Sequence, residues 1–156
     1  MLDVNYVSTQ GRHLERRVDI NQVAPAVQYP NLTQNINSLR AYQGYTNIYQ
    51  FQNSASSNYQ SLQTGLTRRY ADLTFSVAYT WSKVLTDASA PTDGVQDLEN
   101  YRAERSHASF DRNHVAVISY VYSLPFFKGR GGLREIIAGG WELSGITQLQ
   151  SGGWLT

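Results

Sequence analysis

The chain of 156 residues contains no cysteine, few charged side chains and no long apolar run. The lack of cysteine excludes a disulfide framework and thiolate metal sites. Charged residues make up only 16% of the chain, and the net charge of +1 gives no reason to expect nucleic acid or another strongly charged partner. Because no stretch of 18 apolar residues occurs, a transmembrane helix is excluded. The length corresponds to about one domain.

Catalytic and cofactor motifs are also missing from the sequence. Ser106, His107 and Asp111 could be assembled into a hydrolytic triad, but no G-x-S-x-G turn surrounds a serine. The glycine-rich segment Gly129–Gly132 lacks the spacing and the lysine of a phosphate-binding loop. We therefore expect that the protein is not an enzyme and that it uses no cofactor.

What the chain does contain is a strict alternation of apolar and polar residues in the segment DLTFSVAYTWS, Asp72–Ser82. Successive side chains of a strand point to opposite faces, so one face of this strand is apolar and aromatic and the other small and polar. The pattern continues towards Leu85. A strand of about 14 residues, tilted by about 40°, rises roughly 35 Å, which exceeds the apolar band of an outer-membrane barrel, about 25 Å tall. The length of this strand favours a membrane barrel.

Similar alternation predicts further strands elsewhere, and turn residues separate them. We expect turns at Gly11, at the segment SASS and near Ala71–Asp72, and a break at Pro125. A glycine-rich turn and one helical turn are expected within Phe126–Gly140. The strands predicted besides the one ending near Leu85 are Leu2–Ser8, Leu14–Ile20, Tyr45–Asn53, Tyr59–Tyr70, His114–Leu124 and Trp141–Gln150.

These elements predict an all-β fold, an antiparallel up-and-down meander of about six or seven long strands. We expect it to be an open part of a transmembrane β-barrel rather than a closed one. The segment MLDVNYVSTQG lacks the regions of a signal peptide, and strand-like sequence lies at both ends of the chain. The chain is therefore expected to be a piece of a larger barrel.

Aromatic residues recur on the apolar faces of the predicted strands. In transmembrane barrels, aromatic girdles lie at both membrane–water interfaces. We predict that eight residues face lipid or form this belt: Leu73, Phe75, Val77, Tyr79, Trp81, Tyr120, Tyr122 and Trp141. A soluble core could use the same aromatics, so this alternative stays open here.

The polar segment Thr86–Arg112 is too long for an ordinary connection, which is typical of a functional loop. Its carboxylates and histidines could bind a metal or a ligand, but their spacing matches no defined metal motif. Ion pairs within the loop explain the same composition, and we regard that reading as the stronger one. The candidate ligand contacts are Arg102, Glu104, Arg105, His107, Asp111 and Arg112.

Five blocks of sequence occur in an order that resembles a known family. They are SNYQSLQTGLTRRY, LTFSVAYTWSKVLTDAS, YRAERSHASFDRNH, VISYVYSLPFFKGRG and GGWELSGITQLQSGGWLT, and together they cover Asn58–Thr156. The order resembles the C-terminal barrel of TonB-dependent outer-membrane receptors, within them the Oar-like group that carries a carboxypeptidase-regulatory-like domain.

The resemblance implies a partial TonB-dependent receptor barrel spanning residues 1–156, located in the bacterial outer membrane. It also implies transport of a scarce large ligand, with outer-membrane lipid, the rest of the barrel, a plug domain and the TonB complex as partners. The chain lacks a plug, a TonB-contacting motif and a terminal aromatic strand. Two alternatives remain: a small complete eight-stranded barrel acting as anchor or adhesin, and a soluble antiparallel β protein that binds a ligand.

Overall fold

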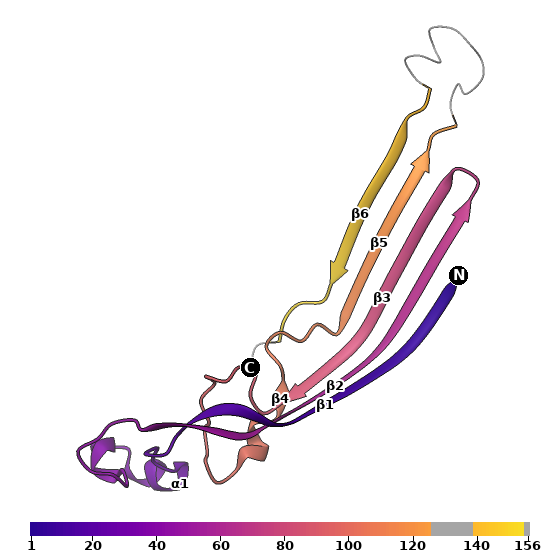
Figure 1. Cartoon of the computed structure of the whole chain (residues 1–156). Helices are drawn as coiled ribbons and strands as arrows, with labels where there is room; N and C mark the ends of the chain where they lie inside the picture. The colour runs from indigo at the N-terminus through magenta and orange to yellow at the C-terminus, as the bar shows by residue number, and fades with distance from the viewer. Residues whose placement is uncertain (126–138, 155–156) are drawn as a thin grey trace. The chain divides into compact units, whose positions relative to one another are not determined.

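The computed structural model describes residues 1–125 and 139–154 and contains one antiparallel sheet in this part of the chain (Figure 1). Neighbouring strands follow the order β1-β2-β3-β5-β6, and the short β4 pairs with β3. This open meander confirms the predicted fold class, with six strands. The strands are β1 (Leu2–Asp19), β2 (Tyr49–Tyr70), β3 (Leu73–Thr86), β4 (Ser106–His107), β5 (His114–Ser123) and β6 (Glu142–Gln150).

The helices of the described residues are short and lie in the two long connections. They are α1 (Pro25–Gln28), η1 (Tyr29–Asn31), η2 (Ile36–Leu39) and η3 (Tyr101–Glu104). None of them is long and apolar enough to cross a membrane.

The chain divides into two compact units, and three strands contribute residues to both. We call the first the sheet region; it comprises Met1–Val7, Gln60–Ser82 and Arg112–Gly152. The second, called the connection region, comprises Ser8–Tyr59, Lys83–Asp111 and Gly153–Thr156.

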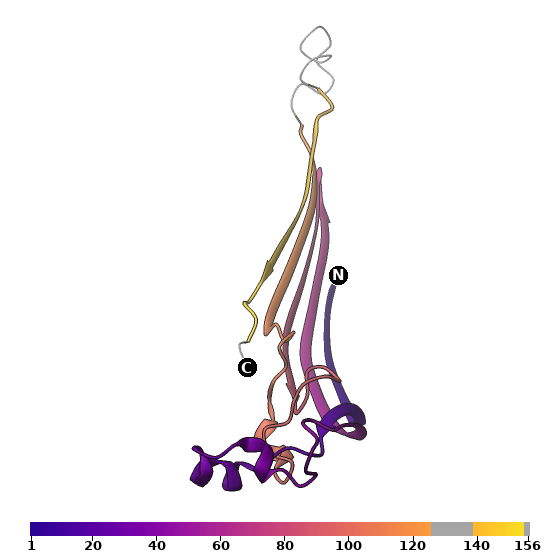
Figure 2. The same ribbon diagram turned by 90° about the vertical axis from the view of Figure 1, so that its left-hand side faces the viewer.

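In the sheet region, β3, β5 and β6 form an unbroken antiparallel ladder. Leu73 lies opposite Tyr122 and Trp81 opposite His114, while Tyr122 also lies opposite Leu143. These strands form a single layer, which Figure 2 shows nearly edge-on. Only Ser61 and Ser82 are buried among the described residues of this region. Neither face of the sheet is therefore packed into a core of its own.

The predicted turn near Ala71–Asp72 is confirmed, and it joins β2 to β3 through two residues. Ala71 has a φ of 49°, the left-handed conformation that tight hairpin turns require. The predicted strands that became β3, β5 and β6 are also confirmed within a residue or so at their ends. The glycine-rich turn and helical turn predicted within Phe126–Gly140 fall almost wholly outside the described residues.

The turn predicted at Gly11 is wrong, because β1 runs through it as one strand of 18 residues. A Cβ atom at Gly11 would lie 2.7 Å from the Ser57 Oγ and 2.9 Å from a Leu14 methyl carbon. Glycine is needed here for a close approach of side chains rather than for a reversal of the chain.

The turn predicted at SASS is wrong for a related reason, because β2 is one strand of 22 residues. Ala55 is buried, and the Ser56 N–H and hydroxyl both donate to the Asp87 carboxylate, at 2.8 and 2.9 Å. The small residues suit a crowded stretch of strand that packs against the connection after β3. Composition alone does not separate this case from a turn.

Candidate functional site

The eight residues predicted to face lipid are brought onto one face of the sheet by the strand register. On β3 they occupy alternate positions from Leu73 to Trp81, and their partners on β5 include Tyr122 and Tyr120. The backbone N–H of Leu124 donates to the Trp141 carbonyl at 2.9 Å, which extends the β5–β6 register to Trp141. The sequence-based grouping of these side chains is thus reproduced by the pairing, whereas their contact with lipid stays a prediction.

Aromatic side chains mark both ends of this apolar face. Tyr79 and Trp81 lie towards one end, where the Tyr79 hydroxyl is 2.8 Å from His114 Nδ1. Tyr120, Tyr122 and Trp141 lie towards the other end. The face runs from Trp81, opposite His114, to Trp141, beside Leu124, which is ten residues along the strand direction or about 33 Å. After a tilt of about 40° this length rises about 25 Å, which matches the apolar band of a transmembrane barrel, about 25 Å tall.

The opposite face is less polar than the sequence pattern suggested. On β3 it carries Thr74, Ser76, Ala78 and Thr80, but their β5 partners include Val117 and Val121. Ile146 of β6 lies on this face and is 79% exposed. The sequence reading followed β3 and missed this set, because β5 is apolar at both odd and even positions.

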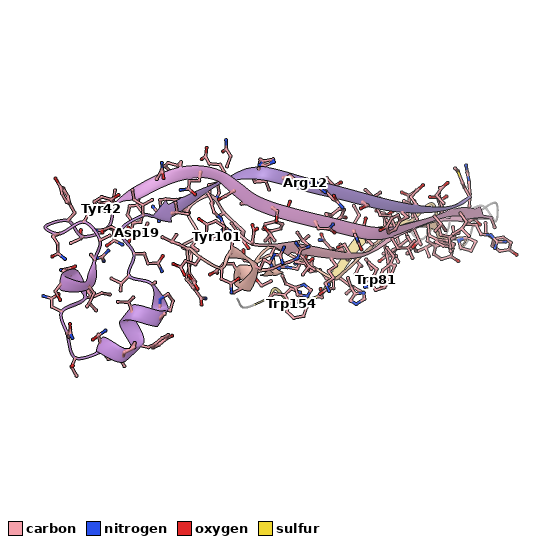
Figure 3. All side chains as sticks on the ribbon, turned by 90° about the horizontal axis from the view of Figure 1, so that it is seen from below. Arg12, Asp19, Tyr42, Trp81, Tyr101 and Trp154 are labelled. Carbon is pink, nitrogen blue, oxygen red and sulfur yellow. The ribbon has the colours of Figure 1, made fainter. Side chains whose placement is uncertain are left out.

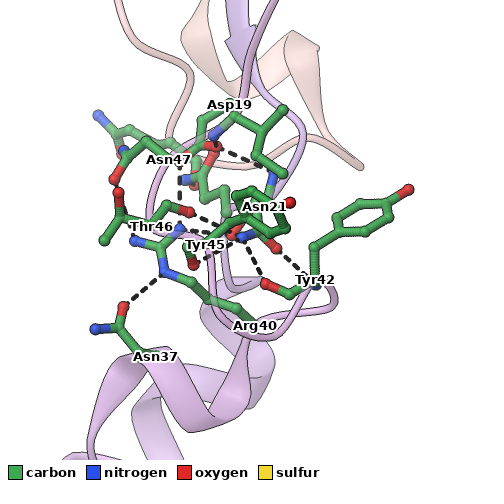
Figure 4. A network of polar contacts seen from close by, with 11 residues as sticks. Asp19, Asn21, Asn37, Arg40, Tyr42, Tyr45, Thr46 and Asn47 are labelled. Carbon is green, nitrogen blue, oxygen red and sulfur yellow. Dashed lines mark hydrogen bonds and ion pairs between the residues drawn. The ribbon is translucent and has the colours of Figure 1, made fainter.

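The connection between β1 and β2 is organised around the fully buried Asn21 (Figure 4). Its side-chain amide donates to the carbonyls of Tyr42, Tyr45 and Thr46 at 2.8–3.2 Å, and its Oδ1 accepts from the Tyr42 N–H at 2.8 Å. One side chain thus satisfies several backbone groups that lie more than 20 residues away. The bonds hold the Tyr42–Thr46 turn in one conformation.

Asp19 and Arg40 complete this network at the end of β1. Asp19 Oδ1 accepts from the backbone N–H groups of Asn21 and Ile48, and its Oδ2 lies 3.5 Å from Arg40 Nη1. Arg40 also donates to the Asn21 carbonyl and to the side-chain oxygens of Asn37 and Asn47. Both charged groups are therefore used inside the connection.

A second network begins where β3 ends. The Asp87 carboxylate lies 3.3 Å from the guanidinium of Arg16, a residue of β1 that is only 1% exposed. The same carboxylate accepts the two hydrogen bonds from Ser56. The Arg16 guanidinium stands 4.9 Å from the centre of the Tyr101 ring. The cation that binds this acid comes from β1, not from the arginines interleaved with the acids of the second connection.

His107 and Asp111 form the clearest side-chain pair among the predicted ligand contacts. His107 Nδ1 lies 2.8 Å from Asp111 Oδ2, and the carboxylate is fully buried. The other side of the histidine is occupied by Trp154, whose ring stacks on it at 3.9 Å between centres (Figure 3). Ser106 Oγ donates to the His107 carbonyl at 3.5 Å, so it is not directed at the imidazole as a triad serine would be.

The remaining predicted contacts are not brought together. Glu104 accepts from the Gln96 N–H at 2.8 Å. Arg102 and Arg105 are exposed, and Arg112 belongs to the sheet region, where its carbonyl accepts from Ser82 Oγ at 3.0 Å. Residues 1–125 and 139–154 contain no group of three or more histidine and acidic side chains arranged to hold a metal ion.

Two cavities open within the connection region. The larger, about 540 Å³, is lined by residues of the second connection and by Trp154. The smaller, about 310 Å³, lies where the first connection meets residues 94–95 of the second. Both volumes fall within the usual range of small-molecule sites, roughly 300–1,000 Å³.

Sequence reasoning missed four residues that line these cavities, namely Asp19, Arg40, Asp87 and Trp154. It also missed Arg16, which pairs with Asp87, and Asn21, which bonds to Asp19. Asp19 is the last residue of β1, and its side chain accepts a hydrogen bond from the backbone N–H of Asn21, two residues later. This arrangement is a common turn signal. The partners of Asn21 and Asp87 lie 21 to 71 residues away in sequence, and no local pattern reports contacts of that range.

The family model described as an outer membrane beta barrel domain matches residues 1–156. No curated protein and no solved structure matches the chain.

Proposed function

The chain belongs to the family of outer membrane beta barrel domains, and from this premise we propose that it forms part of the wall of a TonB-dependent transporter. The bacterial outer membrane is its location. The soluble alternative is thereby set aside. The open sheet supplies consecutive strands of the barrel wall. The transported molecule is a scarce large ligand.

One observation carries the proposal. The register of β3, β5 and β6 gathers an apolar face about 25 Å tall with aromatic side chains at both ends. This face meets the lipid, and the face that carries Thr74, Ser76 and Thr80 meets the lumen. The assignment follows the alternation of apolar-out and polar-in residues in membrane barrels.

The connections support an orientation for these strands. Membrane barrels have short periplasmic turns and longer extracellular loops. The two-residue turn at Ala71–Asp72 is accordingly periplasmic, and the long connections after β1 and β3 are extracellular. In this orientation most residues that line the two cavities belong to extracellular connections.

The alternative role is that of a small eight-stranded barrel that anchors or adheres. The two roles differ in their need for TonB. We expect the full gene product that contains this chain, purified from outer membranes in detergent, to be retained on a column carrying the periplasmic domain of TonB. If the protein passes through the column without retardation, and ligand uptake is unchanged in cells lacking TonB, the transporter role is contradicted and the anchor role is favoured.

A further inference from the structure

We propose that the smaller cavity of the connection region is a subsite for a neutral, polyhydroxylated ligand, that is, a carbohydrate. We call it the Tyr49 cavity. The inference rests on the proposed transport function and names the class of its cargo. Its lining consists of Arg17, Asp19, Gln22, Val23, Gln28, Ile36, Arg40, Asn47, Tyr49, Gly94 and Val95.

Tyr49 supplies an aromatic surface that is already fixed in place. The guanidinium of Arg17 stands 4.4 Å from the centre of its ring, which holds one face of the ring by a cation–π contact. The tyrosine still keeps 55% of its surface exposed. A rigid, accessible aromatic ring is suited to stack on the apolar C–H face of a sugar ring without losing rotamer freedom on binding.

The side-chain amides of the cavity complement hydroxyl groups. Gln22 donates its N–H to the Gln96 carbonyl at 2.7 Å, which leaves its oxygen as an acceptor. Asn47 accepts from Arg40 at 3.3 Å through its oxygen, which leaves its N–H₂ as a donor. Gln28 adds one group of each kind. A hydroxyl both donates and accepts, so this mixed set fits a polyhydroxylated molecule.

The charged groups of the lining are committed within the protein. Asp19 is held by two backbone N–H groups and by Arg40, and Arg40 makes three further hydrogen bonds. Arg17 donates to the Thr92 carbonyl at 3.1 Å and lies against Tyr49. An ionic ligand gains most from groups that can pair with it directly, and here these groups already have partners. The chemistry of the lining therefore favours a neutral ligand.

The volume of about 310 Å³ is at the lower end for small-molecule sites. It holds one part of a ligand rather than the whole of a large one. This agrees with a large cargo whose other parts contact other surfaces of the transporter.

The test uses the full gene product in detergent and isothermal titration calorimetry. The probes are neutral hexasaccharides of glucose, xylose and mannose, and matched oligomers of uronic acids, each at low and at high salt. We expect binding of at least one neutral hexasaccharide with little dependence on salt. Tyr49→Ala should weaken this binding about tenfold or more, while Tyr49→Phe retains it, since a lost stacking contact of about 1.4 kcal/mol is a factor of ten.

Gln28→Ala should weaken binding roughly three- to tenfold through the lost hydrogen bonds. The matched control is Tyr42→Ala, which removes an exposed tyrosine of the same connection that does not line the cavity. Salt-sensitive binding of uronic acids alone overturns the inference in favour of an anion site. Neutral binding that survives Tyr49→Ala, or no binding of any neutral probe, also overturns it. Retention of the same protein by TonB is a separate readout, so failure here is distinguishable from failure of the transporter role.

Discussion

The sheet region and the connection region are stabilised in opposite ways. In the sheet region, apolar side chains such as Trp81 and Leu143 are more than half exposed, and the two buried residues among those described are serines. In the connection region, Arg16, Asn21 and Asp111 are almost fully buried; Arg16 and Asn21 bond to distant parts of the chain, and Asp111 bonds to His107 four residues away. The sheet therefore depends on its surroundings for burial, whereas the connections are stabilised by hydrogen bonds and ion pairs of their own.

We expect the largest effect from a lysine on the apolar face of the sheet region. Val77 lies midway between Leu73 and Trp81, so Val77→Lys places a charge near the middle of the lipid-facing band. We expect the free energy of unfolding in lipid vesicles to fall by about 2–4 kcal/mol, the usual loss for lysine at the midplane. A denaturant titration of the vesicle-inserted full product measures it.

Ser76→Lys is the control, because Ser76 is adjacent in sequence and lies on the opposite face. It should lower the free energy of unfolding by less than about 1 kcal/mol, because at the same depth its side chain faces the lumen instead of the lipid. Equal losses for both variants contradict the assignment of faces.

Asn21→Ala should affect the connection region alone. It leaves the carbonyls of Tyr42, Tyr45 and Thr46 without their donor, at roughly 1–3 kcal/mol in local stability. Hydrogen exchange followed by mass spectrometry should show faster exchange in peptides of residues 20–48 and no change in β3 or β5. Asn31→Ala, which removes a bond to the Val27 carbonyl on the exposed side of the same connection, should change far less. Accelerated exchange throughout the sheet argues against separate frameworks.

Gly145→Ala tests packing between strands of the sheet region. A Cβ at this position would lie 2.8 Å from the Tyr120 hydroxyl and 2.9 Å from its ring, so the ring must move. We expect a loss of about 1 kcal/mol in the free energy of unfolding, with a changed tyrosine signal in near-ultraviolet circular dichroism. Gly152→Ala is the control, since nothing lies within 4 Å of that site. If both variants behave alike, Tyr120 does not pack over Gly145.

Ala71→Gly is the smallest change and the one that should stabilise. Ala71 holds a φ of 49°, which glycine adopts without a Cβ penalty. The free energy of unfolding should rise by about 0.5–1 kcal/mol. Asp72→Gly should bring no gain, because among the described non-glycine residues only His13 and Ala71 have a positive φ. A loss of stability in Ala71→Gly contradicts the described turn.

The two regions also differed in how far the sequence could predict them. The two faces of β3, β5 and β6 could be predicted from the alternation of residues along each strand, because successive side chains of a strand point to opposite faces. The predictions failed at Gly11 and at Ser56, where small residues serve close contacts with other segments rather than turns. Among the predicted ligand contacts, His107 and Asp111 do meet, because they are four residues apart. The partners of Asn21 and Arg16 depend on how distant segments fold back, which no local pattern encodes.

The two-residue turn at Ala71–Asp72 has a consequence for the order in which the sheet forms. Closing a loop becomes less favourable with its length, by about 0.6 kcal/mol for each doubling. The connection after β3, residues 87–113, exceeds this turn in length by between three and four doublings. Closing the loop that pairs β3 with β5 therefore costs about 2 kcal/mol more free energy than closing the turn that pairs β2 with β3. The β2–β3 hairpin should therefore form first, within microseconds. Strand β5 then pairs with the exposed edge of β3, and β6 pairs with β5.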